Sequence, residues 1–369
     1  MRGQWIGKYS GDVEGTLILN IDEVSEQYLG VVYIRPNDDN IPSSVAYFKT
    51  KDRNASQVLK AEIYPFDPMT GYQSTWDQVK KYYSKNVSHS SESEIKIKFI
   101  KSKRKLTISA ISQIGTKLKT ELIQPENKDQ SKIDGLKLTW SEFKEHVSGM
   151  SKSQFIFRGQ KEPWRLRTSF HRRGRFRISE FTSVDVKTLH KRLSAITSHL
   201  FDLTVPDQNG SFLNLLQHHG YPTPLLDWSY SPYVSAFFAF RDWPIRYGGN
   251  GNVRIYVFNN KKWKANFRQV ENLDPPFPHL SIMEFIAIDN PRLVPQQAIT
   301  TVTNLDDIEA YVLKQEQIAD MNFLYAIDIP ASYREEAMSD LRFMGITAGS
   351  MFPGVDGVCE EIREGNFDK

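Results

Sequence analysis

The sequence contains a single cysteine, Cys359, and no long apolar run. One cysteine excludes an internal disulfide and leaves no cysteine cluster that would bind zinc. No stretch approaches the ~18 apolar residues that a membrane helix needs, and the N-terminal residues lack the apolar core of a signal peptide. With 40% hydrophobic and 25% charged residues, the composition is that of an ordinary globular protein. We therefore expect a cytoplasmic protein of two or three domains that has no membrane partner.

Acidic residues are scarce in one part of the chain. Although the net charge is only +3, the stretch from Arg158 to Arg177 carries eight basic residues and one acid, Glu162. Such a stretch can hold the phosphates of a nucleotide or of a nucleic acid. Alternatively, these side chains are solvated or pair with the acidic C-terminal segment, which begins at Asp306. The charge pattern leaves both interpretations open.

The first 125 residues are predicted to form an all-β domain. Apolar residues alternate with polar ones around Leu17 and Leu19 and again around Ile95, as in strands with one face in water. Glycines and a run of Asn and Asp separate these segments as turns. The stretch from Tyr64 to Ser93 is predicted to be a long loop. Short strands joined by such turns indicate a small antiparallel barrel or sandwich, for which we expect a sensor or regulatory role toward a partner.

A polar segment separates this domain from the rest of the chain. Residues 126–137 show no periodicity and are predicted to be a linker. Thr139 and Glu142 then form a capping box, in which both side chains bond free amides at a helix start. A second capping box predicts that the last helix begins at Ser332. Residues 138–369 mix helical and strand patterns, so the chain as a whole is predicted to be an α+β protein.

Two short segments of the second domain combine structural patterns with polar side chains. Residues 153–157 have the apolar and aromatic make-up of a buried strand, which is predicted to end at Arg158 and Gly159. Arginine offers a planar fork of donors for phosphate or carboxylate, and glycine lets a ligand approach the main chain. Further on, Ser231 is predicted to cap a helix whose first residue is Pro232. A helix start of this kind favours anions.

These segments resemble the FRG domain, a family marked by a Phe-Arg-Gly tripeptide and a His-His-Gly-x-Pro-Thr-x-Leu-Leu-Asp-Trp block. The tripeptide is Phe157-Arg158-Gly159, and the longer block occupies residues 218–228. The resemblance extends over about residues 138–369. Its layout is similar to that of ADP-ribosyltransferases, which bind NAD between an arginine-bearing strand and a later Ser-x-Ser. The resemblance therefore implies a mixed domain of ADP-ribosyltransferase-like architecture with NAD as its substrate.

The resemblance also implies a role for each matching residue. Arg158 would hold a phosphate or ribose of NAD, Gly159 would offer backbone hydrogen bonds to the nicotinamide amide, and Ser229 would brace the site. The other residues that we expect to contact the cofactor are Gln160, Arg165, Asp227 and Trp228.

The acidic role of the transferases is less defined in this sequence. Gln296 falls near the position of their glutamate, but an amide can only position a ribose hydroxyl and cannot act as a base. Glu284 and Glu309 are nearby in the sequence and are alternatives for that role. His219 is a further catalytic candidate, because histidine titrates near neutral pH.

Three hypotheses about function follow. In the first, the protein cleaves NAD and transfers ADP-ribose to a macromolecule, as a toxin or an antiviral effector, and its first domain selects the target or restrains the enzyme. The alternative is a non-catalytic nucleic-acid-binding module that uses the basic stretch from Arg158 to Arg177. A third hypothesis is a metal-dependent nuclease that uses His219 and Asp227, although the sequence shows no carboxylate cluster.

Overall fold

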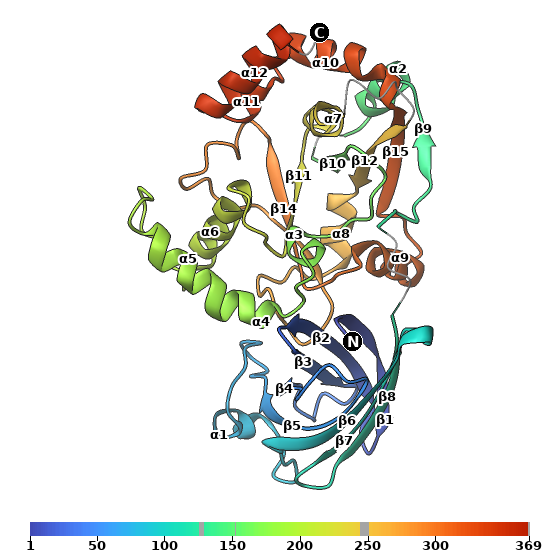
Figure 1. The fold of residues 1–369 in the computed structure, drawn as a ribbon, viewed down its shortest axis with the longest axis vertical. Coiled ribbons are helices and arrows are strands. Elements are labelled where there is room, and N and C mark those ends of the chain that lie inside the picture. Colours follow the sequence, from blue (N-terminus) through green and yellow to red (C-terminus); the bar gives the residue numbers. More distant parts are fainter. Residues whose placement is uncertain (125–128, 152, 244–250, 368–369) are drawn as a thin grey trace.

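The chain folds into two parts that lie one against the other (Figure 1). The structure, a computed structural model, describes residues 1–124, 129–151, 153–243 and 251–367. Of the predicted linker, residues 126–128 lie outside the described residues. The N-terminal part is a closed β-barrel, and the C-terminal part is a seven-stranded sheet surrounded by helices. Within the described part, no helix is long and apolar enough to cross a membrane.

The barrel consists of eight strands, and every neighbouring pair is antiparallel. The strands are β1 (Gly3–Gly11), β2 (Gly15–Val24), β3 (Gln27–Pro36), β4 (Ser44–Lys49), β5 (Ser56–Pro65), β6 (Glu92–Ile100), β7 (Lys105–Ser112) and β8 (Lys117–Ile123). Because β1 pairs with both β2 and β8, the sheet closes on itself. The all-β prediction is confirmed, and of its two forms the structure shows the barrel.

The alternation in the sequence decides which side chains fill the barrel. Successive side chains of a strand point to opposite faces, so every second residue faces the interior. Leu17 and Leu19 of β2 and Ile95 and Ile97 of β6 are buried in the barrel core. Lys96, between the two isoleucines, is exposed. The period of two in the sequence is therefore the inside-outside pattern of the barrel.

Two connections of the barrel contain short helical turns. The predicted loop between β5 and β6 includes α1 (Trp76–Val79) and the 3-10 turn η1 (Lys80–Tyr82). Thr75 and Gln78 form a capping box at the start of α1, which gives this otherwise irregular segment one fixed turn. Between β6 and β7 the chain makes the 3-10 turn η2 (Lys101–Lys103).

The C-terminal domain is built on a sheet with the strand order β13-β14-β11-β10-β12-β15-β9. Its strands are β9 (Gly135–Lys137), β10 (Ile156–Gln160), β11 (Leu225–Ser229), β12 (Asn252–Phe258), β13 (Leu280–Met283), β14 (Ala298–Thr303) and β15 (Leu324–Pro330). Neighbouring strands are antiparallel except β15 and β9, which are parallel. Strand β9 comes from within the segment interpreted as a linker, and it forms one edge of the sheet.

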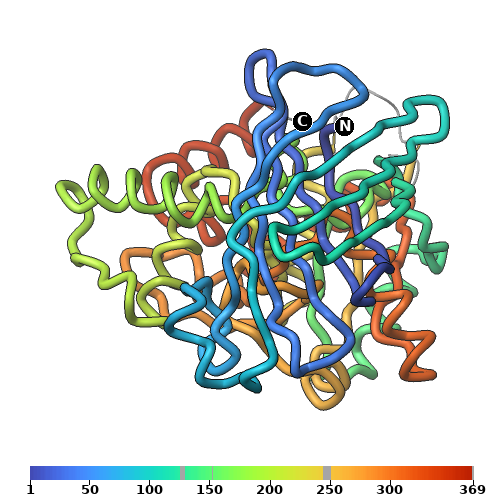
Figure 2. The backbone as a smooth tube through the Cα atoms, turned by 90° about the horizontal axis from the view of Figure 1, so that it is seen from below, coloured from blue at the N-terminus to red at the C-terminus, as the bar shows by residue number. Residues whose placement is uncertain are grey.

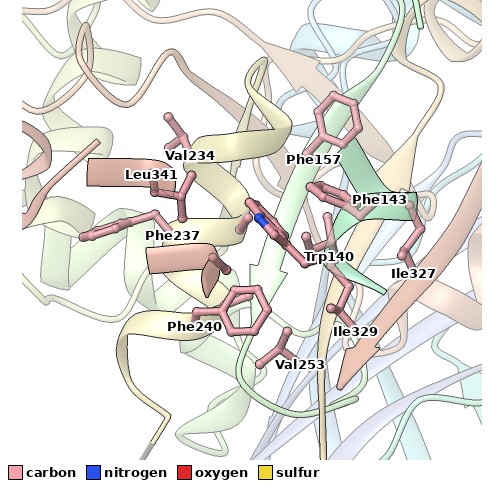
Figure 3. Close-up of a cluster of buried hydrophobic side chains, with 14 of the residues drawn as sticks. Trp140, Phe143, Phe157, Val234, Phe237, Phe240, Val253, Ile327, Ile329 and Leu341 are labelled. Carbon is pink, nitrogen blue, oxygen red and sulfur yellow. The ribbon is translucent and has the colours of Figure 1, made fainter. Parts of the chain in front are cut away.

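Helices pack on both faces of this sheet. The helices and helical turns of the domain are α2 (Trp140–Ser148), α3 (Ser169–Arg172), α4 (Ile178–Glu180), the π-helical turn η3 (Phe181–Asp185), α5 (Val186–Leu193), α6 (Pro206–His218), α7 (Pro232–Arg241), α8 (Asn260–Asn266), α9 (Ile308–Ala319), η5 (Ala331–Tyr333), α10 (Arg334–Phe343), α11 (Ala348–Met351) and α12 (Val355–Phe367). Along β12, Ile255 and Val257 belong to a core cluster with α2, α7, α10 and α11. Figure 3 shows part of this cluster, with Val253 of β12 near Phe240 of α7 and Trp140 of α2. Tyr256 and Phe258 belong to a second cluster, with α8 and α9, on the opposite face. The sheet is thus buried on both sides.

The structure confirms the predicted helix caps at two of the three positions that the sequence indicated. Thr139 and Ser231 cap α2 and α7, and each side chain accepts a hydrogen bond from the amide of the third helical residue. The prediction at Ser332 is wrong, because Ser332 lies within η5, α10 begins at Arg334, and α11 and α12 follow. Strand β15 ends at Pro330 and the chain passes directly into a 3-10 turn, so Ser332 never occupies the cap position.

Seen from below, the blue to teal barrel lies across the C-terminal domain (Figure 2). Gln4 of β1 donates from its side-chain amide to the backbone oxygen of Asn304, at 2.6 Å. Asp22 of β2 accepts a hydrogen bond of 2.6 Å from the amide of Phe176. These buried contacts join the first two strands of the barrel to loops of the C-terminal domain.

Candidate functional site

Strands β10 and β11 are neighbours in the middle of the sheet. They pair at Phe157 and Ser229, and β10 pairs with β12 along its whole length on the other side. Because β10 spans Ile156–Gln160, Arg158 and Gly159 lie inside the strand. The strand ends at Gln160, one residue later than predicted, and backbone pairing with β12 continues through both residues of the Arg-Gly pair.

A cavity of about 390 Å³ opens where β10, β11 and α7 meet the segment that precedes β14. Its wall brings together residues that are far apart in the sequence. The predicted site residues that line it are Arg158, Gly159, Gln160, Asp227, Trp228, Ser229 and Gln296. The fold therefore gathers most of the predicted site around one hollow.

Gly159 is needed for the close packing of α7 on β10. A Cβ atom at this position would lie 1.8 Å from the backbone oxygen of Ser235 and 2.9 Å from the backbone nitrogen of Ala239. Backbone atoms of a packed helix cannot rotate away as a side chain can. The sequence suggested that this glycine serves the approach of a ligand, and the structure adds a packing reason for it.

The guanidinium of Arg158 is held at the cavity by the main chain of β11. Its Nη1 donates to the backbone oxygen of Asp227, at 2.6 Å. Burial, together with the charge of Arg172, lowers the pKa of Arg158 to about 10, while the charge of Asp227 acts in the opposite direction. This pKa still keeps the guanidinium charged at neutral pH. A partly desolvated cation inside a cavity favours an anionic ligand.

Three buried polar atoms of this cavity have no hydrogen-bond partner in the described part of the chain. They are Nε of Arg158, Oε1 of Gln160 and Oδ1 of Asp227. A buried polar atom without a partner costs about 1–3 kcal/mol, and native proteins contain few of them. One donor and two acceptors on residues that line the cavity are therefore unsatisfied within the described part of the chain.

The cavity carries more positive than negative side chains. The charged residues that line it are Arg158, Lys161, Arg172 and Arg292, which are cationic, and Asp227 and Asp242, which are acidic. An excess of one sign in a concave surface concentrates its field and attracts the opposite charge. Arg292 also donates to the backbone oxygen of His218, at 2.7 Å, which ties the segment before β14 to the end of α6.

Ser229 and Gln296 brace one wall of the cavity, and both are buried. The hydroxyl of Ser229 donates to the backbone oxygen of Gln296 at 2.7 Å and accepts from the amide of Ser231 at 3.0 Å. The side-chain amide of Gln296 donates to the backbone oxygen of Met351, at 2.9 Å. The single hydroxyl proton of Ser229 is thus already used, so this side chain is placed to support the site rather than to attack a substrate.

Arg165 and His219 do not line the cavity. Arg165 is buried and donates from Nη1 to the carboxylate of Asp307, at 2.7 Å. His219 is exposed just after α6, whereas His218 lines the cavity, with its Nδ1 2.9 Å from Oδ1 of Asn290. Adjacent residues at a helix end point in different directions, so only one of the two histidines faces the cavity. The geometry gives no support to the predicted cofactor contact of Arg165 or to the predicted catalytic role of His219.

Neither glutamate considered for the acidic role lines this cavity. Glu309 is 6% exposed, and its carboxylate accepts from the hydroxyl of Tyr256 at 2.9 Å. Glu284 is exposed and accepts from the hydroxyl of Tyr230 at 2.8 Å. Asp227, in contrast, lines the cavity, and its Oδ1 is buried and unpartnered among the described residues. Asp227 is therefore the acidic group that the geometry favours.

The aromatic side chains divide between the core and the cavity. Trp228 lines the cavity but is only 4% exposed, and its ring centroid lies 5.7 Å from that of Phe258, so its ring packs in the core. Trp164, Phe238 and Phe352 are half-buried and line the cavity. Flat side chains in such positions can stack on the ring of a base.

Several lining residues were not assigned to the site by the sequence analysis. Lys161 and Arg172 belong to the basic stretch, so the charge pattern of the sequence could have indicated them as site residues. For His218, the spacing of adjacent residues shows that only one histidine can face a cavity, but not which one. Phe238 and Phe352 come from segments that only the tertiary fold brings together (their rings meet edge to face at 5.9 Å).

Much of the basic stretch from Arg158 to Arg177 is used in ion pairs. Nε of Arg167 lies 2.7 Å from Oδ1 of Asp306, and Arg167 is only 8% exposed. Arg175 and Arg177 also bond to carboxylates of neighbouring residues. Pairing with the acidic segment that starts at Asp306 is thus observed for Arg167, whereas Arg175 and Arg177 pair with Asp185 and Glu180. These ion pairs leave fewer free cations for a nucleic-acid surface.

The metal-dependent hypothesis has no supporting geometry. Among the described residues, no group of three or more His, Cys, Asp and Glu side chains could hold a metal ion. His219 lies outside the cavity that Asp227 lines, so the two side chains proposed for this role are not brought together.

Fold and cavity define an α+β protein in which a largely antiparallel sheet carries a cavity lined by more cationic than acidic side chains. Residues 153–244 match the family model of the FRG domain, so the chain contains an FRG domain. The match includes β10, β11 and α7, which form much of the cavity wall. A search of curated proteins and a search of solved structures found no match.

Proposed function

We propose that the C-terminal domain binds NAD in this cavity, cleaves it and transfers ADP-ribose to a macromolecule. The observation that carries the proposal is the group of unpartnered buried atoms on Arg158, Gln160 and Asp227 in a cavity with excess positive charge. NAD offers pyrophosphate oxygens to the guanidinium, and amide and hydroxyl hydrogens to the two acceptors. The ADP-ribosyltransferase-like layout that the FRG resemblance implies supports the same substrate.

The dimensions and walls of the cavity support a nucleotide ligand. Its volume of about 390 Å³ falls within the range of small-molecule sites. In the proposed complex, Arg158 and Arg172 bind the pyrophosphate, and Gln160 accepts a hydrogen bond from a ribose hydroxyl or an amide. Trp164 and Phe352 offer flat surfaces to the adenine or nicotinamide ring.

In the proposed reaction, the bond between C1′ of the ribose and the nicotinamide nitrogen breaks. Nicotinamide leaves with the bonding electron pair, which neutralises its positive nitrogen. The ribose carbon becomes electron-poor, and the fixed carboxylate of Asp227 stabilises this oxocarbenium-like centre. A nucleophile of the acceptor then bonds to C1′ and gives up its proton to solvent.

An enzyme of this kind fits a toxin or an antiviral effector whose activity must be controlled. In the proposed arrangement, the barrel restrains the enzyme or selects its macromolecular target. Its buried contacts with loops of the C-terminal domain, such as those of Gln4 and Asp22, support a regulatory role.

The test is NAD affinity by calorimetry together with nicotinamide release, with cell lysate added as the source of acceptor. Wild-type protein is compared with Arg158→Ala and Arg173→Ala. Arg173 is exposed, lies in the same basic stretch and does not line the cavity, so it is the matched control. We expect Arg158→Ala to weaken NAD binding at least ten-fold and to abolish release, while Arg173→Ala behaves as wild type.

Two outcomes contradict the proposal. One is a wild-type protein that neither binds NAD nor releases nicotinamide. The other is an Arg158→Ala variant that binds and cleaves NAD as well as wild type does. Arg158→Lys tests whether charge alone is sufficient. Because lysine keeps the charge but loses the bidentate fork, we expect its NAD affinity to lie between those of wild type and Arg158→Ala.

A further inference from the structure

One end of the barrel is filled by large side chains. Trp5 of β1 and Phe99 of β6 meet edge to face, with 5.9 Å between their ring centroids. Strand pairing places Phe99 opposite Leu106, and Leu106 opposite Leu122. All four belong to the barrel core and lie near the strand ends joined by the β2–β3 and β6–β7 connections. This end of the barrel is therefore closed by packing.

Toward the other end, the inward positions carry small side chains. Ala110 of β7 pairs with Ile95 of β6. At the next inward-facing pair, two residues along each strand, Ser112 pairs with Ser93. Ala46 of β4 is buried in the same core. A cavity of about 370 Å³ remains inside the barrel at this end. The apolar side chains that line it are Val13, Leu17, Val32, Ile34, Phe48, Ile63, Ile95, Ile97, Ile108 and Leu118.

Hollow apolar space of this size is unusual in a protein interior. Interiors are normally packed as densely as organic crystals, and an unfilled apolar wall loses its dispersion contacts. An eight-stranded barrel is just wide enough either to be filled by side chains or to hold one small ligand. Here the small residues leave the space unfilled, so the barrel matches the second case.

The cavity has an apolar floor and polar groups near its mouth. Phe48 lies over Gly30, where a Cβ atom would come within 2.0 Å of the phenylalanine ring, and this ring faces the cavity. Tyr9 and Ser44 contribute hydroxyl groups nearer the open end, and Oγ of Ser44 lies 3.1 Å from Nε2 of His89. The walls thus suit an apolar chain, and the mouth suits one polar group.

We propose that the barrel binds one small, mainly apolar molecule, an acyl or alkyl chain with a polar group at one end. The chain occupies the barrel down to Phe48, and the polar end meets the hydroxyl groups of Tyr9 and Ser44. This site is distinct from the cavity at Arg158 and does not depend on the NAD proposal. It gives the barrel a ligand of its own, through which the domain can act as a sensor.

The test is calorimetric titration of the full-length protein with decanol and with decanoate. Ala110→Phe fills the cavity, and Ser109→Phe adds the same ring at the adjacent, exposed position on the outside of β7. We expect wild type and Ser109→Phe to bind with a negative heat-capacity change, the mark of apolar burial. Ala110→Phe is expected to lose at least ten-fold in affinity. If Ala110→Phe does not fold, Ala46→Leu provides the same comparison with a smaller increase in volume.

Binding of either probe that is lost on filling the cavity supports the proposal. The ranking of decanoate against decanol then shows whether the polar end is charged. The proposal is overturned if wild type binds neither probe. It is also overturned if wild type and the folded cavity-filling variant bind a probe equally well, because the probe would then lie outside the barrel.

Discussion

Nη1 of Arg158 donates a hydrogen bond of 2.6 Å to the backbone oxygen of Asp227, on the adjacent strand. The guanidinium is therefore oriented by the main chain of Asp227. Nε of Arg158 and Oδ1 of Asp227 are both buried without a partner among the described residues. The two adjacent strands thus each contribute one unpartnered polar atom, a donor on Arg158 and an acceptor on Asp227.

Asp227→Asn is predicted to separate binding from catalysis. Asparagine keeps the size and one acceptor of the side chain but removes its charge. We expect NAD affinity to change only a few-fold, while nicotinamide release falls about 100-fold, because the oxocarbenium-like centre loses its stabilising charge. Calorimetry and a single-turnover assay measure the two effects.

Glu284→Gln is the control for this experiment, since Glu284 is exposed and does not line the cavity. It is expected to bind and cleave NAD as wild type does. A loss of release in Glu284→Gln, with normal release in Asp227→Asn, would assign the acidic role to Glu284.

Gly159→Ala is predicted to destabilise the C-terminal domain. The added methyl group would meet the backbone of α7 at 1.8 Å, and relieving such a contact costs about 1–3 kcal/mol or more. Gly149→Ala is the matched control, because its φ of −82° suits alanine and no atom lies within 4 Å of the added Cβ. The measurement is the thermal unfolding temperature of both variants and of wild type, which we expect to fall only in Gly159→Ala. Equal stability of Gly159→Ala and wild type would contradict the close packing of α7 on β10.

Arg167→Ala is predicted to act on stability and not on ligand binding. Removing one partner of a buried ion pair costs about 3–5 kcal/mol where the other charge is left uncompensated. We expect a smaller loss here, because Nη2 of Arg165 stays 3.9 Å from Oδ2 of Asp306. The carboxylate left behind is that of Asp306, now 2.7 Å from Nε of Arg167. The free energy of unfolding measures the loss, and NAD affinity of the folded fraction should be unchanged. A variant that stays stable but loses salt-dependent binding to nucleic acid would instead identify the basic stretch as an interface.

The contact between Tyr33 and Asp274 joins the barrel to the C-terminal domain and makes stability depend on pH. The hydroxyl of Tyr33 donates to the carboxylate of Asp274. Burial raises the pKa of Asp274 to about 7, although the bond from Tyr33 acts to lower it. In the unfolded chain the pKa is about 3.9. Between these values the folded state binds more protons, so the stabilisation present below pH ~4 is lost as the pH rises through about 7.

Asp274→Asn removes this titration. Relative to wild type, the variant should gain about 3 kcal/mol between pH 5 and pH 8, since asparagine cannot ionise. Denaturant unfolding at the two pH values measures the difference. Glu271→Gln, an exposed neighbour on the same interdomain surface, should leave the difference unchanged. Parallel changes of stability in wild type and Asp274→Asn would show that Asp274 is ionised in the folded protein at both pH values.

Local patterns predicted the parts of this fold that depend on neighbouring residues. The alternation around Leu17 and Ile95 indicated strands with one buried face, and the barrel buries those residues. Ser231 caps α7 as predicted, because an N-cap bond joins residues only three positions apart. The prediction of a helix start at Ser332 was wrong because it used only the local capping pattern. The chain that leaves β15 first forms a 3-10 turn, which that pattern does not reveal.

The sequence by itself determined that a strand-rich domain comes first and that a mixed domain follows. It also predicted Arg158 and Asp227 as site residues, and the structure places both at one cavity. These conclusions rest on periodicity and on side-chain types, which a sequence displays directly. Only the tertiary structure decided that β1 closes on β8, that Gly159 makes room for α7, and that Asp227 rather than Glu309 faces the cavity. Each of these features depends on contacts between residues that are far apart in the sequence. Arg158 and Asp227, for example, are separated by 69 positions, and no local pattern encodes such a contact.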